Sequence, residues 1–326
     1  MLKETLCGTL YRPGLLMAGL LAALTACTTG GEGLLVPATV RSDTALPRFE
    51  LKDGRFVHLQ TFGDRASPTL IVLHGGPGGD YRDYLSLETF ADDFFVVLWD
   101  QRGTGLSERV PSGELTGPTY LVDLDFIGRH FSPARPFHLI GHSWGGAYAT
   151  YYIQSFPDRV GRVVLAEPGA LDAEAALKAN VAPTDFGSGE LHEVLNTTDY
   201  ILPDSDARAD YFYVIALAGF RNDERLLGYD FWRLGYQANI GINTWQGNFD
   251  RSYSFNFTRG LHAFKGRALF ITGLAGSRLG YDFQMKYHVP HFPSSEVLHL
   301  PDAKHSELLR RPESIKRIRD FLRGAL

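Results

Sequence analysis

The sequence predicts an α/β protein in which a mostly parallel sheet has helices on both faces and carries an inserted, mainly helical cap. Three observations support this prediction. Short apolar runs recur along the chain, segments with helical spacing separate most of them, and one long region with many aromatic side chains interrupts the alternation. Continuous apolar strands that alternate with helices are typical of a parallel sheet covered on both faces.

Six apolar runs mark the strands of the parallel part. They are residues 69–73, 94–98, 137–140, 163–166, 268–272 and 297–300. Upstream, residues 49–51 and 56–59 flank Asp53-Gly54, a pair that favours a tight hairpin turn. We therefore expect the first strands to pair antiparallel, so that the complete sheet is mixed.

Two prolines delimit expected helices. Residues 150–156 end at Pro157, which closes the helix before it. Pro312 begins the C-terminal segment, where Ile315 and Ile318 belong to an apolar stripe. A proline at the start and a stripe at this spacing predict an amphipathic C-terminal helix.

The alternation of strands and helices breaks between residues 171 and 262. An insertion after the strand 163–166 lies above the carboxyl ends of the strands, where α/β proteins place their sites. We therefore predict a core in two parts, 48–170 and 263–326, and a cap of residues 171–262. We expect most aromatic side chains of the cap to fill its own core and a minority to line a pocket.

The N-terminal segment is typical of a secretory signal. Lys3 and Arg12 form a weakly basic start, and the apolar run 15–24 is too short to span a bilayer as a helix. Cys7, one of the two cysteines, lies within this segment. The remainder of the chain avoids stray thiols, which is consistent with an oxidising compartment.

The apolar run leads into a Leu-Thr-Ala-Cys sequence that ends at Cys27 and resembles a bacterial lipobox. This resemblance implies removal of residues 1–26 and acyl chains on Cys27, which together anchor a protein stably. Residues 27–47 then form a flexible tether. Thr28 in place of Asp favours the outer membrane of the cell envelope. A plain secretory signal cleaved near Ala26 is the alternative.

Composition excludes several function classes. The 326 residues carry a formal net charge of −5 and no run rich in Lys and Arg, so no nucleic acid partner is expected. The sequence has no internal repeat, P-loop or dinucleotide glycine signature, and no cofactor is expected. Membrane contact is expected through the N-terminal anchor alone, and nothing in the sequence specifies an oligomeric state.

Residues 141–145 form the pentapeptide Gly-His-Ser-Trp-Gly, between an apolar run and a helical segment. A sharp strand-to-helix turn of this kind exposes the side-chain oxygen of its serine, and the flanking glycines avoid collisions with neighbouring backbone. This context predicts that Ser143 is the nucleophile of a serine hydrolase. The alternative is a structural serine in a glycine-rich turn.

Two further motifs precede the pentapeptide: His-Gly-Gly-Pro-Gly-Gly at 74–79 and Asp-Gln-Arg-Gly-Thr-Gly at 100–105. Together the three motifs resemble the proline iminopeptidase branch of the α/β-hydrolases. The resemblance covers residues 48–170 well and 263–326 at the level of the fold. It implies an α/β-hydrolase fold and an aminopeptidase that forms an acyl-enzyme on Ser143.

The resemblance also implies an oxyanion hole made by the backbone N–H groups of Gly76 and Trp144. We expect the Gly76–Pro77 peptide to be cis, since cis bonds before proline occur in tight turns. His74 is expected to be a structural hydrogen-bonding residue. Residues 100–105 are expected to be a turn that braces the oxyanion loop.

His305 is the predicted general base, because it follows the last expected strand, where this fold places its histidine. His142, beside the nucleophile, is expected to point into packing. His288 and His291 have the spacing of a metal pair, but Pro290 interrupts any helix and no third ligand is evident. No metal site is therefore predicted.

The acid of the catalytic triad departs from the pattern of the resembling family. Members carry Asp three residues after the glycine that ends the penultimate strand, whereas here Gly276 stands at that distance from Gly273. Glu167 follows an earlier strand, preserves the order Ser, acid, His, and is the first choice. Asp282 is the alternative, followed by Asp302 or no acid.

Two substrate classes fit this site. An aminopeptidase, placed slightly ahead because of the three motifs, needs a carboxylate for the free ammonium of a short peptide. The cap candidates are Glu190, Glu193, Asp199, Asp204, Asp206, Asp210, Asp223, Glu224 and Asp230. The Trp-rich stretch ending in Glu that marks the family's cap is missing, and its nearest approach ends in Gln246. A carboxylesterase or lipase-like enzyme, acting on small acyl esters or lactones, needs no such carboxylate. A non-catalytic binding lipoprotein is the third possibility.

Overall fold

The computed structural model describes residues 35–179, 202, 204–219 and 229–324; the predicted signal segment and Cys27 lie outside them. The chain divides into two compact units, Met1–Leu35 and Val36–Leu326. In the described part of the second unit, eight strands form one mixed sheet with the order β1-β2-β4-β3-β5-β6-β7-β8. Among the described helices, none has both the length and the apolar character needed to cross a membrane.

The strands coincide closely with the predicted apolar runs. They are β1 Arg48–Glu50, β2 Phe56–Phe62, β3 Thr69–Leu73, β4 Phe95–Trp99, β5 Phe137–His142, β6 Val160–Ala166, β7 Arg267–Thr272 and β8 Ser295–His299. β2 pairs antiparallel with both β1 and β4, whereas the other neighbouring strands are parallel. The predicted mixed sheet is therefore confirmed.

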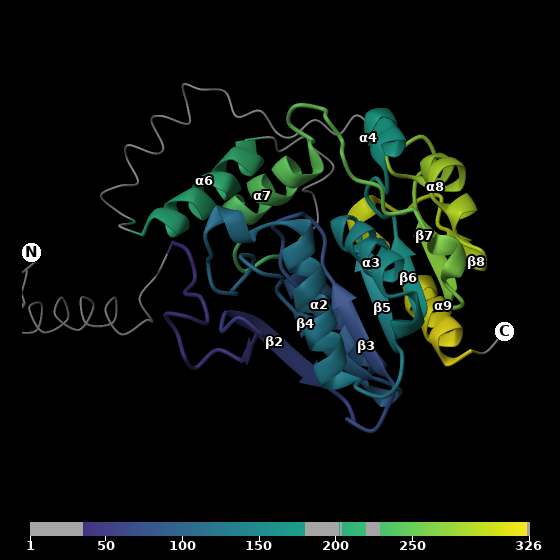
Figure 1. Cartoon of the computed structure of the whole chain (residues 1–326), viewed down its shortest axis with the longest axis horizontal. Coiled ribbons are helices and arrows are strands. Elements are labelled where there is room, and N and C mark those ends of the chain that lie inside the picture. Colours follow the sequence, from purple (N-terminus) through teal and green to yellow (C-terminus); the bar gives the residue numbers. More distant parts are fainter. Residues whose placement is uncertain (1–34, 180–201, 203, 220–228, 325–326) are drawn as a thin grey trace, which may run out of the picture. The chain divides into compact units, whose positions relative to one another are not determined.

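Helices occupy the connections between the strands (Figure 1). They are α2 Gly117–Phe131, α3 Trp144–Ser155, α4 Ala173–Ala179, α6 Ser205–Gly219, α7 Tyr236–Gln246, α8 Tyr281–Tyr287 and α9 Pro312–Arg323. The 3-10 helices are the 11-residue η1 Arg82–Asp92 and the short η2 Ser112–Glu114, η3 Pro157–Arg159, η4 Leu261–Ala263, η5 Val289–His291 and η6 His305–Glu307. α3 ends before Pro157 and α9 starts at Pro312, as the prolines predicted.

The core has two layers because both faces of the sheet are covered. All residues of β3 and β4 are buried, which explains their unbroken apolar runs. Successive side chains of a strand point to opposite faces. Ile71 accordingly belongs to a cluster with Tyr148 of α3, whereas Val72 packs in the cluster of Phe90 from η1 and Phe321 from α9. α2 and α3 lie together over one face (Figure 1).

The segment predicted as a flexible tether packs against the body where the structure describes it. Val36 and Val40 are buried, and the Val40 N–H donates to the Leu106 carbonyl at 2.8 Å. The Arg233 guanidinium donates to the Pro37 carbonyl at 2.7 Å. The two buried valines and the two hydrogen bonds hold residues 36–40 against the body, so a flexible tether does not extend over these residues.

Within the predicted cap the described α-helices are α4, α6 and α7. Helices α6 and α7 lie beside each other at one end of the sheet (Figure 1). Asp210 of α6 accepts hydrogen bonds from the guanidinium groups of Arg109 at 2.9 Å and Arg233 at 2.7 Å. Asn239 of α7 donates to the Pro77 carbonyl at 2.8 Å. These contacts place α7 against the loop that follows β3.

Candidate active site

Ser143 occupies the sharp turn between β5 and α3. Its backbone has φ 55° and ψ −121°, a region that residues with side chains rarely adopt. The Ser143 N–H donates to the Ala166 carbonyl at the end of β6, at 3.0 Å. The predicted strand–turn–helix context of the pentapeptide is therefore present, with its strained central serine.

Close backbone contacts explain the two glycines of the pentapeptide. A Cβ atom added to Gly141 would lie 2.4 Å from the Gly145 carbonyl oxygen, and one added to Gly145 would lie 2.0 Å from the Leu73 carbonyl oxygen. Both distances are well below a van der Waals contact. The turn can pass between β3 and its own helix because these two positions lack a side chain.

The ring of His305 contacts a buried carboxylate. His305 begins η6 after β8, and its Nδ1 lies 2.6 Å from Glu167 Oε2. Glu167 follows β6, is 1% exposed, and accepts the Gly273 N–H on its other oxygen at 2.7 Å. A carboxylate beside Nδ1 keeps the proton on that nitrogen, and Nε2 of the neutral ring is then free to accept a proton.

The other acids considered from the sequence have different partners. Asp282 Oδ2 accepts the Gly276 N–H at 3.2 Å, within the turn before α8. Asp302 is paired with Arg311, 3.7 Å away at the surface. Among these carboxylates, that of Glu167 contacts the His305 ring.

His142 links His305 to the loop after β3. The His142 and His305 rings lie 4.5 Å apart, and His142 Nε2 donates to the His305 carbonyl at 2.9 Å. Burial holds the pKa of His142 well below its usual value, and the nearby His305 lowers it further. The ring is therefore neutral, so Nδ1 accepts from the Tyr84 hydroxyl at 2.7 Å, and that hydroxyl accepts the Gly75 N–H at 3.0 Å.

This relay from Gly75 through Tyr84 to His142 and His305 was missed at the level of sequence. The prediction for His142 was limited to packing, and Tyr84 belongs to no recognisable motif. The four residues come from separate parts of the chain, and their partners are determined by the packing of η1 against the sheet.

Residues 100–105 contact the loop that follows β3, which is the predicted oxyanion loop. His74 Nδ1 donates to the Gly75 carbonyl at 2.9 Å, and Nε2 accepts the Gln101 N–H at 3.0 Å. Burial lowers the pKa of His74, which keeps the ring neutral as these two bonds require. The buried Asp100 carboxylate accepts the Tyr81 N–H at 2.8 Å. The Gly76–Pro77 peptide is cis, as predicted.

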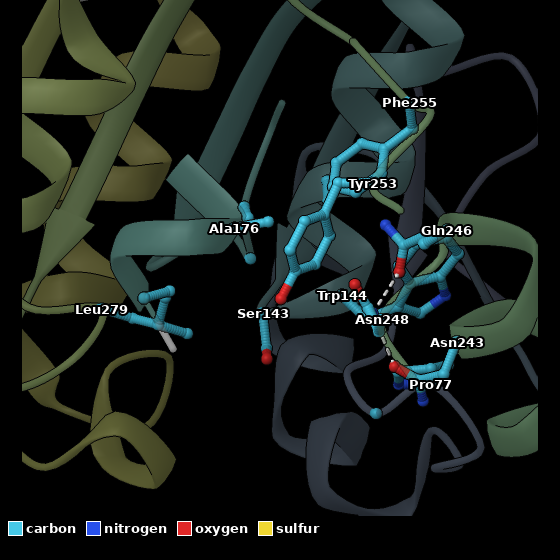
Figure 2. Close-up of a pocket in the computed structure, with 15 residues that line it drawn as sticks. Pro77, Ser143, Trp144, Ala176, Asn243, Gln246, Asn248, Tyr253, Phe255 and Leu279 are labelled. Atoms are coloured by element: carbon cyan, nitrogen blue, oxygen red, sulfur yellow. Dashed lines mark hydrogen bonds between the residues drawn. The ribbon is translucent and has the colours of Figure 1, made fainter. Parts of the chain in front are cut away.

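A cavity of about 120 Å³ opens at Ser143 (Figure 2). Its lining includes the predicted oxyanion residues Gly76 and Trp144. The other lining residues are Pro77, Ala147, Gly169, Ala170, Ala176, Ala179, Asn243, Gln246, Asn248, Tyr253, Phe255 and Leu279. None of these described lining residues carries a charge, and the polar ones are three amides and two hydroxyls.

The cap carboxylates proposed as ammonium ligands do not line this cavity where the structure describes them. Asp210 is held by two arginines, and Asp204 accepts the Ala207 N–H at 2.7 Å at the start of α6. Glu190, Glu193, Asp199, Asp223 and Glu224 lie outside the described residues.

His288 has a protein partner rather than a ligand. Its Nδ1 donates to Gln284 Oε1 at 2.7 Å, and burial lowers its pKa to about 3. Among the described residues, no group of three His, Cys, Asp or Glu side chains is placed to hold a metal ion.

Comparisons with known proteins agree with this architecture. A family model described as alpha/beta hydrolase fold matches residues 68–311. The proline iminopeptidase of Heyndrickxia coagulans is 34% identical over 116 residues, covering 35% of this chain and 40% of that protein. The chain therefore matches less than half the length of this relative.

Two solved structures resemble the whole core. A thermophilic esterase from Thermogutta terrifontis aligns with a TM-score of 0.59 at 20% identity, covering 85% of this chain and 98% of the esterase. Proline iminopeptidase from Mycobacterium smegmatis aligns with a TM-score of 0.55 at 18% identity, covering 85% and 97%. At these identities the two likenesses establish the fold and do not separate the two activities.

Proposed function

The chain belongs to the α/β-hydrolase fold family, and we propose that it is a serine hydrolase that works through an acyl-enzyme on Ser143. Its resemblance to the proline iminopeptidases is confirmed by the matching relatives. The observation that carries the proposal is the strained serine at the end of β5 together with the His305–Glu167 pair at the neighbouring strand ends.

The proposed chemistry needs side chains and backbone groups alone. His305 Nε2 takes the proton from Ser143 Oγ as that oxygen attacks the carbonyl carbon, and then gives the proton to the leaving group. A water molecule then attacks the acyl-enzyme with the same two proton transfers through His305, and the carboxylic acid is released. Glu167 holds the tautomer and stabilises the imidazolium that forms.

Gly76 and Trp144 are proposed to receive the oxyanion. Their backbone N–H groups belong to residues that line the same cavity as Ser143. Trp144 is the first residue of α3, so its N–H has no acceptor within the helix. Losing one such donor typically costs about 10²–10³ in rate.

The substrate supported best is a small carboxylic ester with an uncharged acyl group. Transferring an ammonium ion into a pocket without a carboxylate partner is costly, whereas an uncharged group meets alanine, leucine and amide side chains there. An aminopeptidase is the second candidate, favoured by the proline iminopeptidase relative. In that case a carboxylate from beyond the described lining must bind the ammonium.

Turnover on two matched panels tests this proposal. The full chain in detergent and its Ser143→Ala variant would be given short p-nitrophenyl esters and aminoacyl arylamides, including prolyl. Ester cleavage that depends on Ser143 is expected. Arylamide cleavage that is blocked by acetylating the substrate amine would establish the aminopeptidase instead. No turnover and no fluorophosphonate labelling of Ser143 would overturn the hydrolase and leave a binding lipoprotein.

We also propose that the chain is a lipid-anchored protein of the cell envelope, on the basis of the sequence before Cys27. Expression in a bacterium with an alkyne-tagged fatty acid tests this. The wild type and a Cys7→Ala variant are expected to take up the label, and a Cys27→Ala variant is expected to lose it. Equal labelling without Cys27 would exclude a lipid anchor at this residue.

A further inference from the structure

Three side-chain amides are hydrogen-bonded to one another in the cavity beside Ser143, and the backbone carbonyl of Asn239 joins them to a fourth amide residue that contacts the loop after β3. Asn239, Asn243 and Gln246 belong to α7, and Asn248 follows the helix. Gln246 is 5% exposed and lines the cavity with Asn243 and Asn248. These four residues are called the amide ladder below.

The orientation of each amide follows from a backbone carbonyl, which can only accept. Asn243 Nδ2 donates to the Asn239 carbonyl at 2.8 Å, so its Oδ1 is an acceptor. Asn248 Nδ2 donates to that Oδ1 at 2.7 Å, and the same nitrogen donates to Gln246 Oε1 at 3.2 Å. Reversing any one amide would set two donors or two acceptors against each other.

At the oxyanion end, Asn239 is oriented in the same way. Its Nδ2 donates to the carbonyl oxygen of Pro77, at 2.8 Å. The ladder therefore connects Pro77, in the predicted oxyanion loop, with the amide of Gln246, and Pro77 and Gln246 both line the cavity.

These contacts fix which atom of the Gln246 amide faces the cavity. Its oxygen is occupied by Asn248, and its Nε2 donates to no acceptor among the described residues. Figure 2 shows this nitrogen turned away from Asn248. The end of the ladder is thus an N–H donor facing a pocket whose described lining carries no charge.

We propose that Gln246 Nε2 determines substrate specificity by donating to an uncharged oxygen on the substrate, such as an ether, carbonyl or hydroxyl oxygen. This inference rests on the proposed hydrolase function, and it specifies that the substrate group bound beside Gln246 is a neutral hydrogen-bond acceptor. An ammonium ion has donors and no acceptor, so it would face another donor at this position. The pocket therefore selects an acyl ester bearing a neutral acceptor and disfavours one bearing a free amine.

Binding to the catalytically inactive Ser143→Ala protein tests the inference independently of turnover. The probes are N-alkyl amides of matched length. Each carries one ether oxygen, methylene or ammonium group, and the series places that group at each position of the alkyl chain in turn. The best ether probe is expected to bind about 10-fold more tightly than its methylene counterpart, the range of one neutral hydrogen bond. Equal binding of the two, at every position, would overturn the proposal.

Two substitutions at Gln246 sharpen the test. In the Ser143→Ala background, Gln246→Met keeps the size and removes the donor, so the ether preference is expected to disappear. Gln246→Glu places a carboxylate oxygen where the donor stood, and the ammonium probe is expected to bind best. If the Gln246→Met protein still preferred the ether probe, a residue other than Gln246 would determine the selectivity. Gln154→Met is the matched control, since the Gln154 amide donates to the Asn256 carbonyl outside the cavity lining.

Asn248→Leu tests the ladder itself. Without the donor from Asn248, the Gln246 amide can rotate and present either its oxygen or its nitrogen. The ether and ammonium probes are then expected to bind within about 3-fold of each other. Retention of the full ether preference in Asn248→Leu would show that the ladder does not orient Gln246.

The hydrolase and the specificity proposal can fail separately. In parallel, the protein with Ser143 intact is tested for fluorophosphonate labelling and for hydrolysis of plain alkyl esters. Labelling with equal probe binding would keep the hydrolase and reject the role of Gln246. Selective probe binding without labelling or hydrolysis would support the donor role of Gln246 and reject the hydrolase.

Discussion

His305 illustrates how single contacts determine chemistry at the scale of the residue. Its Nδ1 faces Glu167 at 2.6 Å, and Glu167 is itself fixed by the Gly273 N–H. The second contact occupies one carboxylate oxygen and leaves the other for the histidine. A buried carboxylate held in this way can orient the ring without moving during the reaction.

We predict that Glu167→Gln lowers kcat by about 10³–10⁴ with a small change in KM, because an amide can stabilise the wrong tautomer of His305 and cannot stabilise the imidazolium. Steady-state kinetics on the best ester measure this effect. Asp282→Asn is the matched control and is expected to keep near-normal turnover. If Asp282→Asn lost turnover and Glu167→Gln did not, Asp282 would be the acid.

We predict that Tyr84→Phe lowers kcat about 10-fold and changes KM less. The substitution leaves the Gly75 N–H and His142 Nδ1 without their partner, which loosens the oxyanion loop and the backbone of His305 together. Tyr152→Phe removes a hydroxyl that bonds to Asp125 at 3.0 Å, away from this relay. Equal losses in the two variants would show that Tyr84 acts through general stability alone.

At the scale of the element, the parallel strands bring the predicted catalytic residues to one edge of the sheet. β5, β6, β7 and β8 are neighbours in the sheet and point the same way, so their carboxyl ends form one edge. Ser143, Glu167 and His305 all follow strands of this group. The pairing of these strands therefore brings residues that are far apart in the chain to the same edge of the sheet.

Helix α8 supports the segment that carries Glu167. Gln284 of α8 donates through Nε2 to the carbonyls of Pro168 at 3.0 Å and Leu279 at 2.9 Å, and its oxygen accepts from His288. His288 is fully buried, and its Nε2 has no partner among the described residues. A proton added to this nitrogen would therefore be buried without an acceptor.

We predict that His288 makes the protein acid-sensitive. Its folded pKa of about 3 lies below the ordinary value of 6.5, so its stability contribution is complete above pH 6.5. As the pH falls below 6.5, His288 binds a proton in the unfolded chain and stays neutral in the folded protein. The free energy of unfolding should then fall by about 1.4 kcal/mol per pH unit relative to a variant without this group.

Urea unfolding of the wild type and His288→Phe at pH 7.5, 6 and 5 measures this difference. The stability of the wild type relative to His288→Phe should decrease from pH 7.5 to pH 6 and again from pH 6 to pH 5. His262→Phe, at an exposed position of η4, is the control and should show no such change. A difference between wild type and His288→Phe that is constant with pH would contradict the prediction.

At the scale of the whole molecule, buried ion pairs join the cap to the core. Asp210 of α6 bonds to Arg109, which follows β4, and to Arg233, which precedes α7. All three side chains are nearly inaccessible to water. Arg233 also holds the N-terminal segment through the Pro37 carbonyl, so one cluster fixes three separate parts of the chain.

We predict that Asp210→Ala destabilises the protein by about 3–5 kcal/mol, because it leaves two buried guanidinium groups without their carboxylate. A lower melting temperature and faster cleavage by trypsin within the cap are expected. Asp230→Ala, which changes an exposed cap carboxylate, should behave as the wild type. Unchanged melting of Asp210→Ala would show that solvent or another acid replaces Asp210.

Local patterns in the sequence were sufficient for the strands, the elbow at Ser143 and the cis peptide before Pro77. Burial on both faces produces unbroken apolar runs, and close backbone contacts at Gly141 and Gly145 admit glycine alone. Such constraints act on neighbours in the chain, so they are visible in the sequence. The boundaries of the core and cap, and the lipid anchor at Cys27, stay predictions.

The tertiary structure decided what depends on distant side chains. The sequence named Glu167 as the first choice of acid, with Asp282 and Asp302 as alternatives, and the contact of Glu167 with His305 joins residues 138 positions apart. The relay through Tyr84 had no sequence signal. Gln246 stood out in the sequence only as a Gln in place of Glu, and the contact that joins its ladder to the loop after β3 links Asn239 with Pro77, 162 positions away. Propensity and periodicity describe the backbone, whereas the polarity of a pocket is decided when separate elements meet.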